Sequence, residues 1–193
     1  MARLIVSENI SIDGVIQDPT GDGGLASGGW FNQVTEHDRE AWAELETAEA
    51  MRAEALLMGR GTYEYFAPRW ESRAGAWADR LAALPKYVVT SGRPALTWAN
   101  TMLLTGDAVP AMVAKLKQDV AGELVVNGSV QLAHALLRHH LVDELRLIVF
   151  PSTAGAGARL FDAGPAGRWR LTENRTIGEN LTYTSYVGAA EGD

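Results

Sequence analysis

Two short segments that combine glycine with hydroxyl or amide side chains are suited to binding phosphate groups. Gly59–Thr62 follows the apolar segment 55–58, and Asn127–Ser129 follows the apolar segment 123–126. The first N–H groups of a helix have no partner within it and carry partial positive charge, and glycine lets a phosphate approach the backbone closely. We therefore expect the two segments to hold a diphosphate between adjacent helices. The alternative for each is an ordinary tight connection.

Neither segment matches a standard nucleotide-binding motif. A Walker A loop needs Gly-Lys followed by Ser or Thr, and Gly-Lys does not occur in the chain. Gly59 and Gly61 lack the third glycine of a dinucleotide motif, because Glu64 stands in its place. The segment Gly155–Gly157 fails in the same way at Leu160. The sequence thus supports neither a P-loop NTPase nor a Rossmann domain.

Other candidates for chemistry have two interpretations each. Asp13 stands before Gly14, and Asp-Gly is a common turn dipeptide, but a carboxylate here could also bind substrate or relay a proton. Trp30 and Phe31 come near the end of a glycine-rich segment, residues 13–34, that is expected to be a loop. These aromatic rings could stack on a flat substrate or fill the core.

The absence of cysteine and of a serine hydrolase motif excludes several reaction classes. The chain has no cysteine, which removes disulfides, thiolate metal sites and a cysteine nucleophile. The Gly-x-Ser-x-Gly pattern of serine hydrolases does not occur. His139 and His140, two of four histidines, should end a helix, where cations complement the dipole. We predict no metal site.

Charge and hydropathy bear on the partners. The chain has 17 Lys and Arg against 24 Asp and Glu, a net charge of −7, and no basic run. A nucleic-acid partner is therefore not expected. No apolar run approaches the roughly 20 residues that span a bilayer, and the apolar run near the N-terminus is too short for a signal peptide. We expect no membrane partner and a cytoplasmic location.

The apolar pattern predicts a single α/β domain over residues 1–193. Short apolar runs alternate with amphipathic segments, and two strands follow one another at the end, so the sheet should be mixed, with antiparallel C-terminal strands. Thr35 and Asp38 form a capping box for a helix that runs to about Ala53. The other predicted elements are strands 4–6, 55–58, 86–90, 102–104, 123–126, 144–150, 169–174 and 181–187, and helices 77–84, 130–139 and one beginning near Pro110.

Several motifs in combination resemble the dihydrofolate reductase superfamily. Met58–Glu64 after a strand is similar to its cofactor motif. Ser11–Val15 and Lys86–Thr90 resemble its RibD-like branch, the reductase domain of the riboflavin-biosynthesis deaminase–reductase and its stand-alone relatives. The same branch is matched by Gly128-Ser129 before a leucine-rich helix, by Leu141–Leu145, and by Pro151 with Gly155-x-Gly157-x-x-Leu160-Phe161. The resemblance covers nearly the whole chain in the right order.

This resemblance implies a three-layer αβα sandwich with NADP(H) across the carboxyl ends of the strands. Arg60 would contact the 2′-phosphate, Thr62 the diphosphate, and Asp13 would lie near the nicotinamide as the candidate catalytic residue. Thr90 and Ser91 would line the adenosine end, or simply end a strand. The expected cofactor-binding residues are Gly14, Val15, Gly59, Arg60, Gly61, Thr62, Thr90, Ser91, Asn127, Gly128 and Ser129, and the expected substrate-binding residues are Trp30 and Phe31.

The implied function is an NADPH-dependent reductase of a small planar nitrogen heterocycle, such as the pyrimidine of riboflavin biosynthesis or a pterin. A homodimer is the expected assembly, and a non-catalytic NADP(H)-binding protein is the alternative. The chain departs from the named enzymes at Ser7, where the riboflavin reductase has lysine. Its first helix carries Glu36, Glu40 and Glu44 in one stripe, interpreted as a solvated face, where dihydrofolate reductase has a buried carboxylate. The departures leave the substrate open.

Overall fold

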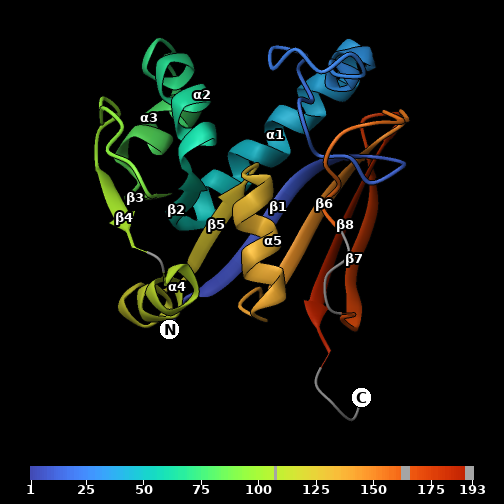
Figure 1. Ribbon diagram of the computed structural model, residues 1–193. Coiled ribbons are helices and arrows are strands. Elements are labelled where there is room, and N and C mark those ends of the chain that lie inside the picture. The colour runs from blue at the N-terminus through green and yellow to red at the C-terminus, as the bar shows by residue number, and fades with distance from the viewer. Residues whose placement is uncertain (107, 162–165, 190–193) are drawn as a thin grey trace.

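The molecule is built on one eight-stranded sheet, in a computed structural model that describes residues 1–106, 108–161 and 166–189 (Figure 1). The strand order is β4-β3-β2-β5-β1-β6-β8-β7. The strands are β1 (Arg3–Ser11), β2 (Ala53–Gly59), β3 (Lys86–Thr90), β4 (Thr101–Thr105), β5 (Glu123–Asn127), β6 (Glu144–Phe150), β7 (Trp169–Ile177) and β8 (Leu181–Gly188). The helices are η1 (Trp30–Gln33), α1 (Glu36–Arg52), α2 (Arg60–Glu71), α3 (Ala76–Ala83), α4 (Val109–Asp119) and α5 (Val130–Arg138).

Helices cover both faces of the sheet. Successive residues of a strand point to opposite faces, so Leu4 and Val6 pack with α4 and α5 while Ile5 packs with α1, α2 and α3. The six strands from β4 to β6 run parallel, whereas β8 and β7 join antiparallel to them. This confirms the predicted three-layer α/β sandwich with antiparallel C-terminal strands. None of the described helices combines the length and apolar character needed to cross a membrane.

The central strand β1 extends beyond its neighbour β5. Ser7 is the last residue of β1 that pairs with β5, opposite Asn127, whereas the pairing with β6 continues to Ser11. After these strands, α1 packs on one face of the sheet and α5 on the other (Figure 1). In open α/β sheets, ligands bind outside the carboxyl ends of the strands where successive connections change face. The end of β5 is such a place.

The start of α1 is fixed by the predicted capping box. Thr35 Oγ1 accepts the Asp38 N–H at 3.1 Å, and the Asp38 carboxylate accepts the Thr35 N–H at 3.3 Å. Asp38 is fully buried and also accepts the N–H groups of Glu179 and Asn180 at 2.7 and 2.9 Å. One carboxylate therefore caps the helix and anchors the turn between β7 and β8.

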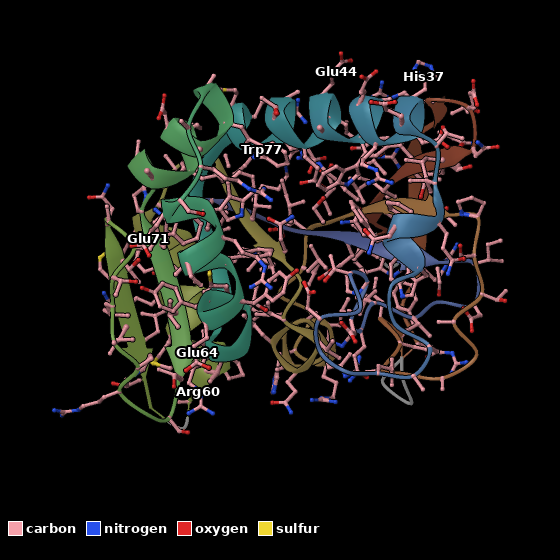
Figure 2. The ribbon with its side chains drawn as sticks, turned by 90° about the horizontal axis from the view of Figure 1, so that it is seen from above. His37, Glu44, Arg60, Glu64, Glu71 and Trp77 are labelled. Atoms are coloured by element: carbon pink, nitrogen blue, oxygen red, sulfur yellow. The ribbon has the colours of Figure 1, made fainter. Side chains whose placement is uncertain are left out.

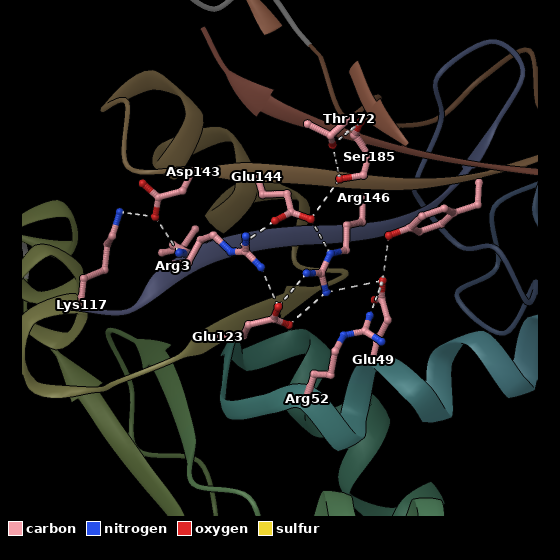
Figure 3. A network of polar contacts seen from close by, with 12 residues as sticks. Arg3, Glu49, Arg52, Lys117, Glu123, Asp143, Glu144, Arg146, Thr172 and Ser185 are labelled. Atoms are coloured by element: carbon pink, nitrogen blue, oxygen red, sulfur yellow. Dashed lines mark hydrogen bonds and ion pairs between the residues drawn. The ribbon is translucent and has the colours of Figure 1, made fainter. Parts of the chain in front are cut away.

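A group of charged side chains is buried where β1, β5, β6 and α1 meet (Figure 3). Arg146 has a side chain only 4% exposed, and its guanidinium lies 2.7 Å from Glu144 and 2.9 Å from Glu123. Glu49 of α1 lies 3.6 Å from the same guanidinium. Burial alone would lower the pKa of Arg146. The hydrogen bonds to Glu123 and Glu144 outweigh this effect and raise the pKa above its ordinary value, so the guanidinium stays charged. This arrangement joins α1 to the sheet.

Replacement of Arg146 should destabilise the fold strongly. Arg146→Met removes the buried cation of this group. Among the described residues, it leaves Glu123 and Glu144 paired with the half-exposed Arg3, and Glu49 with Arg52 at 4.0 Å. Breaking a buried pair in this way costs about 3–5 kcal/mol. The free energy of unfolding in urea measures the loss. Arg175→Met is the matched control, because its pair with Glu173 (2.9 Å) joins side chains that are 50% and 49% exposed, and such pairs contribute below about 1 kcal/mol. Equal losses in the two variants would contradict a structural role for the buried group.

Candidate functional site

The two glycine segments meet at the side chain of Ser129. Its hydroxyl accepts a hydrogen bond from the Gly59 N–H at 2.9 Å and donates one to Thr62 Oγ1 at 2.8 Å. Because β2 and β5 are neighbouring parallel strands, the N-termini of α2 and α5 lie together at the carboxyl edge of the sheet. The segments are neighbours, as the sequence analysis expected. Diphosphate binding between them stays a prediction.

The first turns of both helices are left open. Neither α2 nor α5 has a side chain that caps its N-terminus, and a Cβ built on Gly61 meets nothing within 4 Å. Gly128 and Ser129 have φ values of +63° and +65°, and for a serine this backbone costs of order 1–3 kcal/mol. A Cβ on Gly128 would lie 3.4 Å from Thr62. The turn brings the α5 N-terminus against α2, and the positive φ of Gly128 makes glycine the favoured residue there.

Arg60, the first residue of α2, lies beside the loop that follows β3. Its Nη1 would be 3.6 Å from a Cβ on Gly92, whose N–H is hydrogen bonded to Thr90 Oγ1 at 2.9 Å. The guanidinium is 58% exposed and lies 3.8 Å from Glu64 (Figure 2). Ser91 is exposed in the same loop. An accessible guanidinium next to hydroxyl groups suits an anionic group such as a phosphate.

Asp13 holds two loops together. Its carboxylate accepts hydrogen bonds from the Ser11 hydroxyl at 2.7 Å and from the Ala154 N–H at 2.9 Å. A further bond comes from the Gly155 N–H at 2.8 Å. The Ser11 hydrogen bond, followed by the two backbone bonds, lowers the pKa of Asp13 to about 2. A carboxylate that stays ionised at neutral pH has no proton to give, so the geometry favours the turn interpretation of Asp13.

Gly14 and Val15 belong to the same turn. Gly14 has a φ of +84°, which suits glycine. Val15 is fully buried, and its N–H and C=O are both hydrogen bonded to Ser11, at 2.9 and 3.0 Å. The contact of these two residues with a nicotinamide stays a prediction.

The two aromatic residues after the glycine loop are packed against the sheet. Trp30 is 1% exposed, with its ring 5.5 Å from that of Phe150. The prediction that Trp30 stacks on a substrate is wrong, because the core encloses the ring on all sides. Phe31 contacts Phe150 at 5.0 Å and Trp42 at 4.8 Å. It is only partly buried, and its role in substrate binding stays a prediction.

The glycine loop is tied to α2 by its tip. The Tyr65 hydroxyl is hydrogen bonded to Thr20 at 2.8 Å and donates to Asp22 at 3.0 Å. Arg69 pairs with Asp22 at 3.2 Å. These contacts hold the loop beside the helix that begins with Arg60.

Helix α1 carries carboxylates that the sequence analysis missed. Glu36, Glu40 and Glu44 are exposed as expected, and Glu44 projects away from the sheet in Figure 2. The inference that α1 lacks a buried carboxylate is nevertheless wrong. Glu49, on the inner side, is 3% exposed and accepts the Ser7 hydroxyl at 2.7 Å.

Glu46 lies on the same side of α1 as Trp42 and Glu49. The three positions follow the i, i+4, i+7 spacing of one helix face, and this spacing was the available signal in the sequence. Trp42 Nε1 donates to Asn9 Oδ1 at 2.9 Å, so this face is directed to β1. Burial, followed by the neighbouring charge of Glu49, raises the pKa of Glu46 to about 8. Glu46 therefore holds a proton at neutral pH.

Two surface hollows lie away from these groups. One of about 360 Å³ is formed by α2, α3 and the segment before β4, with Trp70, Arg73 and Trp98 in its lining. The other, of about 230 Å³, lies between α1 and β7. Neither includes Asp13 or a residue of the glycine segments, so we do not assign them to the site.

The strand order and helix layers define the class of the protein, a dihydrofolate reductase-like α/β domain, and solved structures share this fold. A candidate riboflavin biosynthesis protein from Shewanella sp. PV-4 is 21% identical with a TM-score of 0.70, over 97% of this chain and 99% of that chain. RibD from Acinetobacter baumannii is 15% identical with a TM-score of 0.67, over 98% of this chain and 58% of that chain. Dihydrofolate reductase from Enterococcus faecalis, complexed with NADP(H), is 16% identical with a TM-score of 0.62, over 97% of each chain.

The family follows from the sequence profile. The profile of the RibD C-terminal domain matches residues 2–183, and the chain therefore belongs to the RibD C-terminal domain family. None of the curated protein sequences compared with the chain is significantly similar to it. Membership confirms the resemblance seen in the motifs and the class of activity that it implies, an NADP(H)-dependent reductase.

The hydrogen bonds that Asp13 accepts from Ser11, Ala154 and Gly155, here called the loop clasp, allow a prediction of how Asp13→Asn affects stability. An asparagine keeps one acceptor oxygen but loses the charge, so it cannot hold all three donors equally well. Because the folded pKa of about 2 lies below the ordinary 3.8, the clasp stabilises the fold above the ordinary value and is lost as the pH falls through about 2. The variant should be less stable than the wild type at neutral pH, and the difference should shrink below about pH 4.

Thermal unfolding across this pH range measures the effect. Asp119→Asn is the control, because Asp119 is 59% exposed and, among the residues described, pairs only with Lys115 of its own helix, at 3.1 Å. A variant of Asp13 that unfolds like the wild type at neutral pH would show that the clasp does not stabilise the fold.

Proposed function

We propose that this protein is an NADPH-dependent reductase of a small planar nitrogen heterocycle, such as the pyrimidine intermediate of riboflavin biosynthesis or a pterin. The observation that carries the proposal is the contact at Ser129, which joins the open N-termini of α2 and α5. Family membership supports the reaction class, and the dihydrofolate reductase complexed with NADP(H) supports the cofactor.

The residues at this edge fit a dinucleotide. The diphosphate would lie between Gly59–Thr62 and Asn127–Ser129, where two helix ends offer N–H groups and partial positive charge. The space above Gly61, which a Cβ would enter without contact, gives a phosphate room. Arg60 would hold the 2′-phosphate, and Thr90 and Ser91 would line the adenosine end.

Glu46 is our candidate for the proton donor. A bound reduced nicotinamide supplies a hydride to the carbon of a C=N or C=O group, which leaves a nitrogen or oxygen that needs a proton. Glu46 carries a proton at neutral pH, whereas Asp13 does not, because their pKa values are about 8 and about 2. Trp42, which is hydrogen bonded to Glu46 and to Asn9 Oδ1, offers an aromatic ring for a planar heterocycle. We therefore assign proton delivery to Glu46.

The first test concerns cofactor choice. NADPH should bind more tightly than NADH, and Arg60→Ala should remove most of the preference, because a charge-assisted hydrogen bond contributes about 1.5–3 kcal/mol, roughly ten- to a hundredfold in Kd. Fluorescence titration with both cofactors measures the effect. Arg73→Ala is the control, since Arg73 lies just beyond the C-terminal end of α2, against Trp70. Equal binding of the two cofactors by the wild type would refute the role of Arg60.

The second test concerns Glu46. Glu46→Gln should lower turnover by about 10²–10⁴-fold, while NADPH affinity at neutral pH changes little. Because Glu46 is protonated below its pKa of about 8, wild-type turnover should decline as the pH rises through about 8, and the variant should lack this decline. Glu44→Gln, on the exposed side of the same helix, should behave as wild type. Normal turnover by Glu46→Gln would assign the proton to another group or to water.

The substrate is identified by assays of NADPH oxidation. Dihydrofolate and the riboflavin pyrimidine intermediate separate the two substrate classes. NADPH binding without turnover of either compound or related heterocycles would favour the alternative, a non-catalytic NADP(H)-binding protein.

The proposal includes a cytoplasmic location and a homodimer. The chain has no cysteine, which suits a reducing compartment, and stand-alone relatives of this branch are expected to be dimers. Light scattering on the purified protein tests the assembly against the chain mass of 20.8 kDa.

A further inference from the structure

Glu8 is a buried acidic residue beside the second glycine segment. It is 5% exposed, its Oε2 accepts the Gly128 N–H at 3.1 Å, and its Oε1 has no hydrogen-bond partner within the described residues. Glu8 is the first residue of β1 beyond the pairing with β5, which ends where Ser7 faces Asn127. A carboxyl oxygen without a partner is thus buried at the end of β5, next to the N-terminus of α5.

An ionised Glu8 conflicts with an anion at this helix end. The charge would repel a diphosphate, and no ion pair of Glu8 is found within the described residues. The titratable group that faces Glu8 from another element is Glu46 of α1, which in turn faces Glu49. Burial most of all, and Glu46 in addition, raise the pKa of Glu8 well above its ordinary value, although the Gly128 N–H lowers it.

We infer that Glu8 binds the cofactor as a neutral carboxylic acid, with Oε2 on the Gly128 N–H and the proton on Oε1 donated to an oxygen of the diphosphate. The inference rests on the proposed function, because it needs the dinucleotide at this junction. A carboxylate can only accept hydrogen bonds, whereas the protonated acid both accepts and donates. The unpartnered Oε1 thereby gains a partner. A protein molecule in which Glu8 is ionised must therefore take up one proton when it binds the cofactor.

Proton uptake sets the pH dependence of binding. Below the pKa of Glu8 in the free protein, the Kd of NADPH should be independent of pH. Above it, binding should weaken by about tenfold per pH unit, because one proton is bound with the cofactor. The 2′-phosphate of the cofactor titrates at about pH 6. Its second negative charge strengthens binding to Arg60 as the pH rises, so its effect on the Kd is opposite to that of Glu8. The two effects therefore differ in sign.

The experiment measures NADPH binding by fluorescence and by calorimetry from about pH 7 to about 9.5, a range above the phosphate titration. Calorimetry in two buffers of different ionisation enthalpy counts the protons. The wild type should bind more weakly at high pH and take up close to one proton. Glu8→Gln keeps a neutral donor, so it should bind within a few-fold of the wild type at the low end and take up none.

Two further variants locate the effect. Glu44→Gln, exposed on α1, should keep the wild-type profile. Glu46→Gln should keep the slope but begin it at lower pH, because Glu46 raises the pKa of Glu8. The fragment 2′-phospho-ADP-ribose, which has the diphosphate but lacks the nicotinamide, should show the same slope as NADPH.

The outcomes separate the two proposals. A wild type that binds NADPH at no pH would contradict the proposed function itself. Binding without proton uptake, or a slope that persists in Glu8→Gln, would overturn the role of Glu8 and leave the proposed function standing. A slope with NADPH but none with 2′-phospho-ADP-ribose would rule out the diphosphate as the partner. If Glu8→Gln does not fold, the proton count in Glu46→Gln decides the question, because this variant removes the neighbouring carboxyl group whose pKa of about 8 lies in the same range.

Discussion

The hydrogen bonds of a single hydroxyl group hold together the part of the structure on which the site depends. Ser129 reaches the backbone of Gly59, seventy residues away in the chain, and the side chain of Thr62. It does so because its left-handed backbone turns the side chain away from the capping position of its own helix. Two helix ends are thereby joined at one point while their N–H groups stay uncapped.

Strand β1 connects the two halves of the candidate site. A strand in the middle of a parallel sheet is normally apolar on both faces, yet β1 carries Ser7, Glu8 and Asn9 in succession. Ser7 is bonded to Glu49 of α1 on one face, and Glu8 to Gly128 at the start of α5. The strand thus places one carboxyl group at the helix terminus and directs its other polar groups to the inner side of α1. Under the proposed function, this alternation would direct one face of β1 to the cofactor and the other to the proton donor on α1.

Local patterns made much of the fold predictable, and also the closeness of the two glycine segments. The capping box joins Thr35 to Asp38, only three residues further along the chain. The glycine segments are recognisable because the positions of their glycines can be read directly from a few consecutive residues. The buried carboxylates were hidden because a helix shows its exposed stripe in the sequence as clearly as its inner face, and only packing against β1 decides which glutamates matter. Trp30 could not be assigned for the same reason, since its enclosure depends on Phe150, far along the chain. Arg146 likewise finds its partners on three different elements.

The position of β1 between β5 and β6 also bears on how the chain is made. Arg3 pairs with Glu123, and Ile5 with Glu144, so β1 is synthesised long before either of the strands that pair with it. Pairings this distant make folding slow and leave apolar strands exposed. Charged or polar residues within such a strand oppose self-association. The polar side chains of Ser7, Glu8 and Asn9, which hold α1 and the start of α5 in the folded protein, should therefore also oppose association of the unfolded chain.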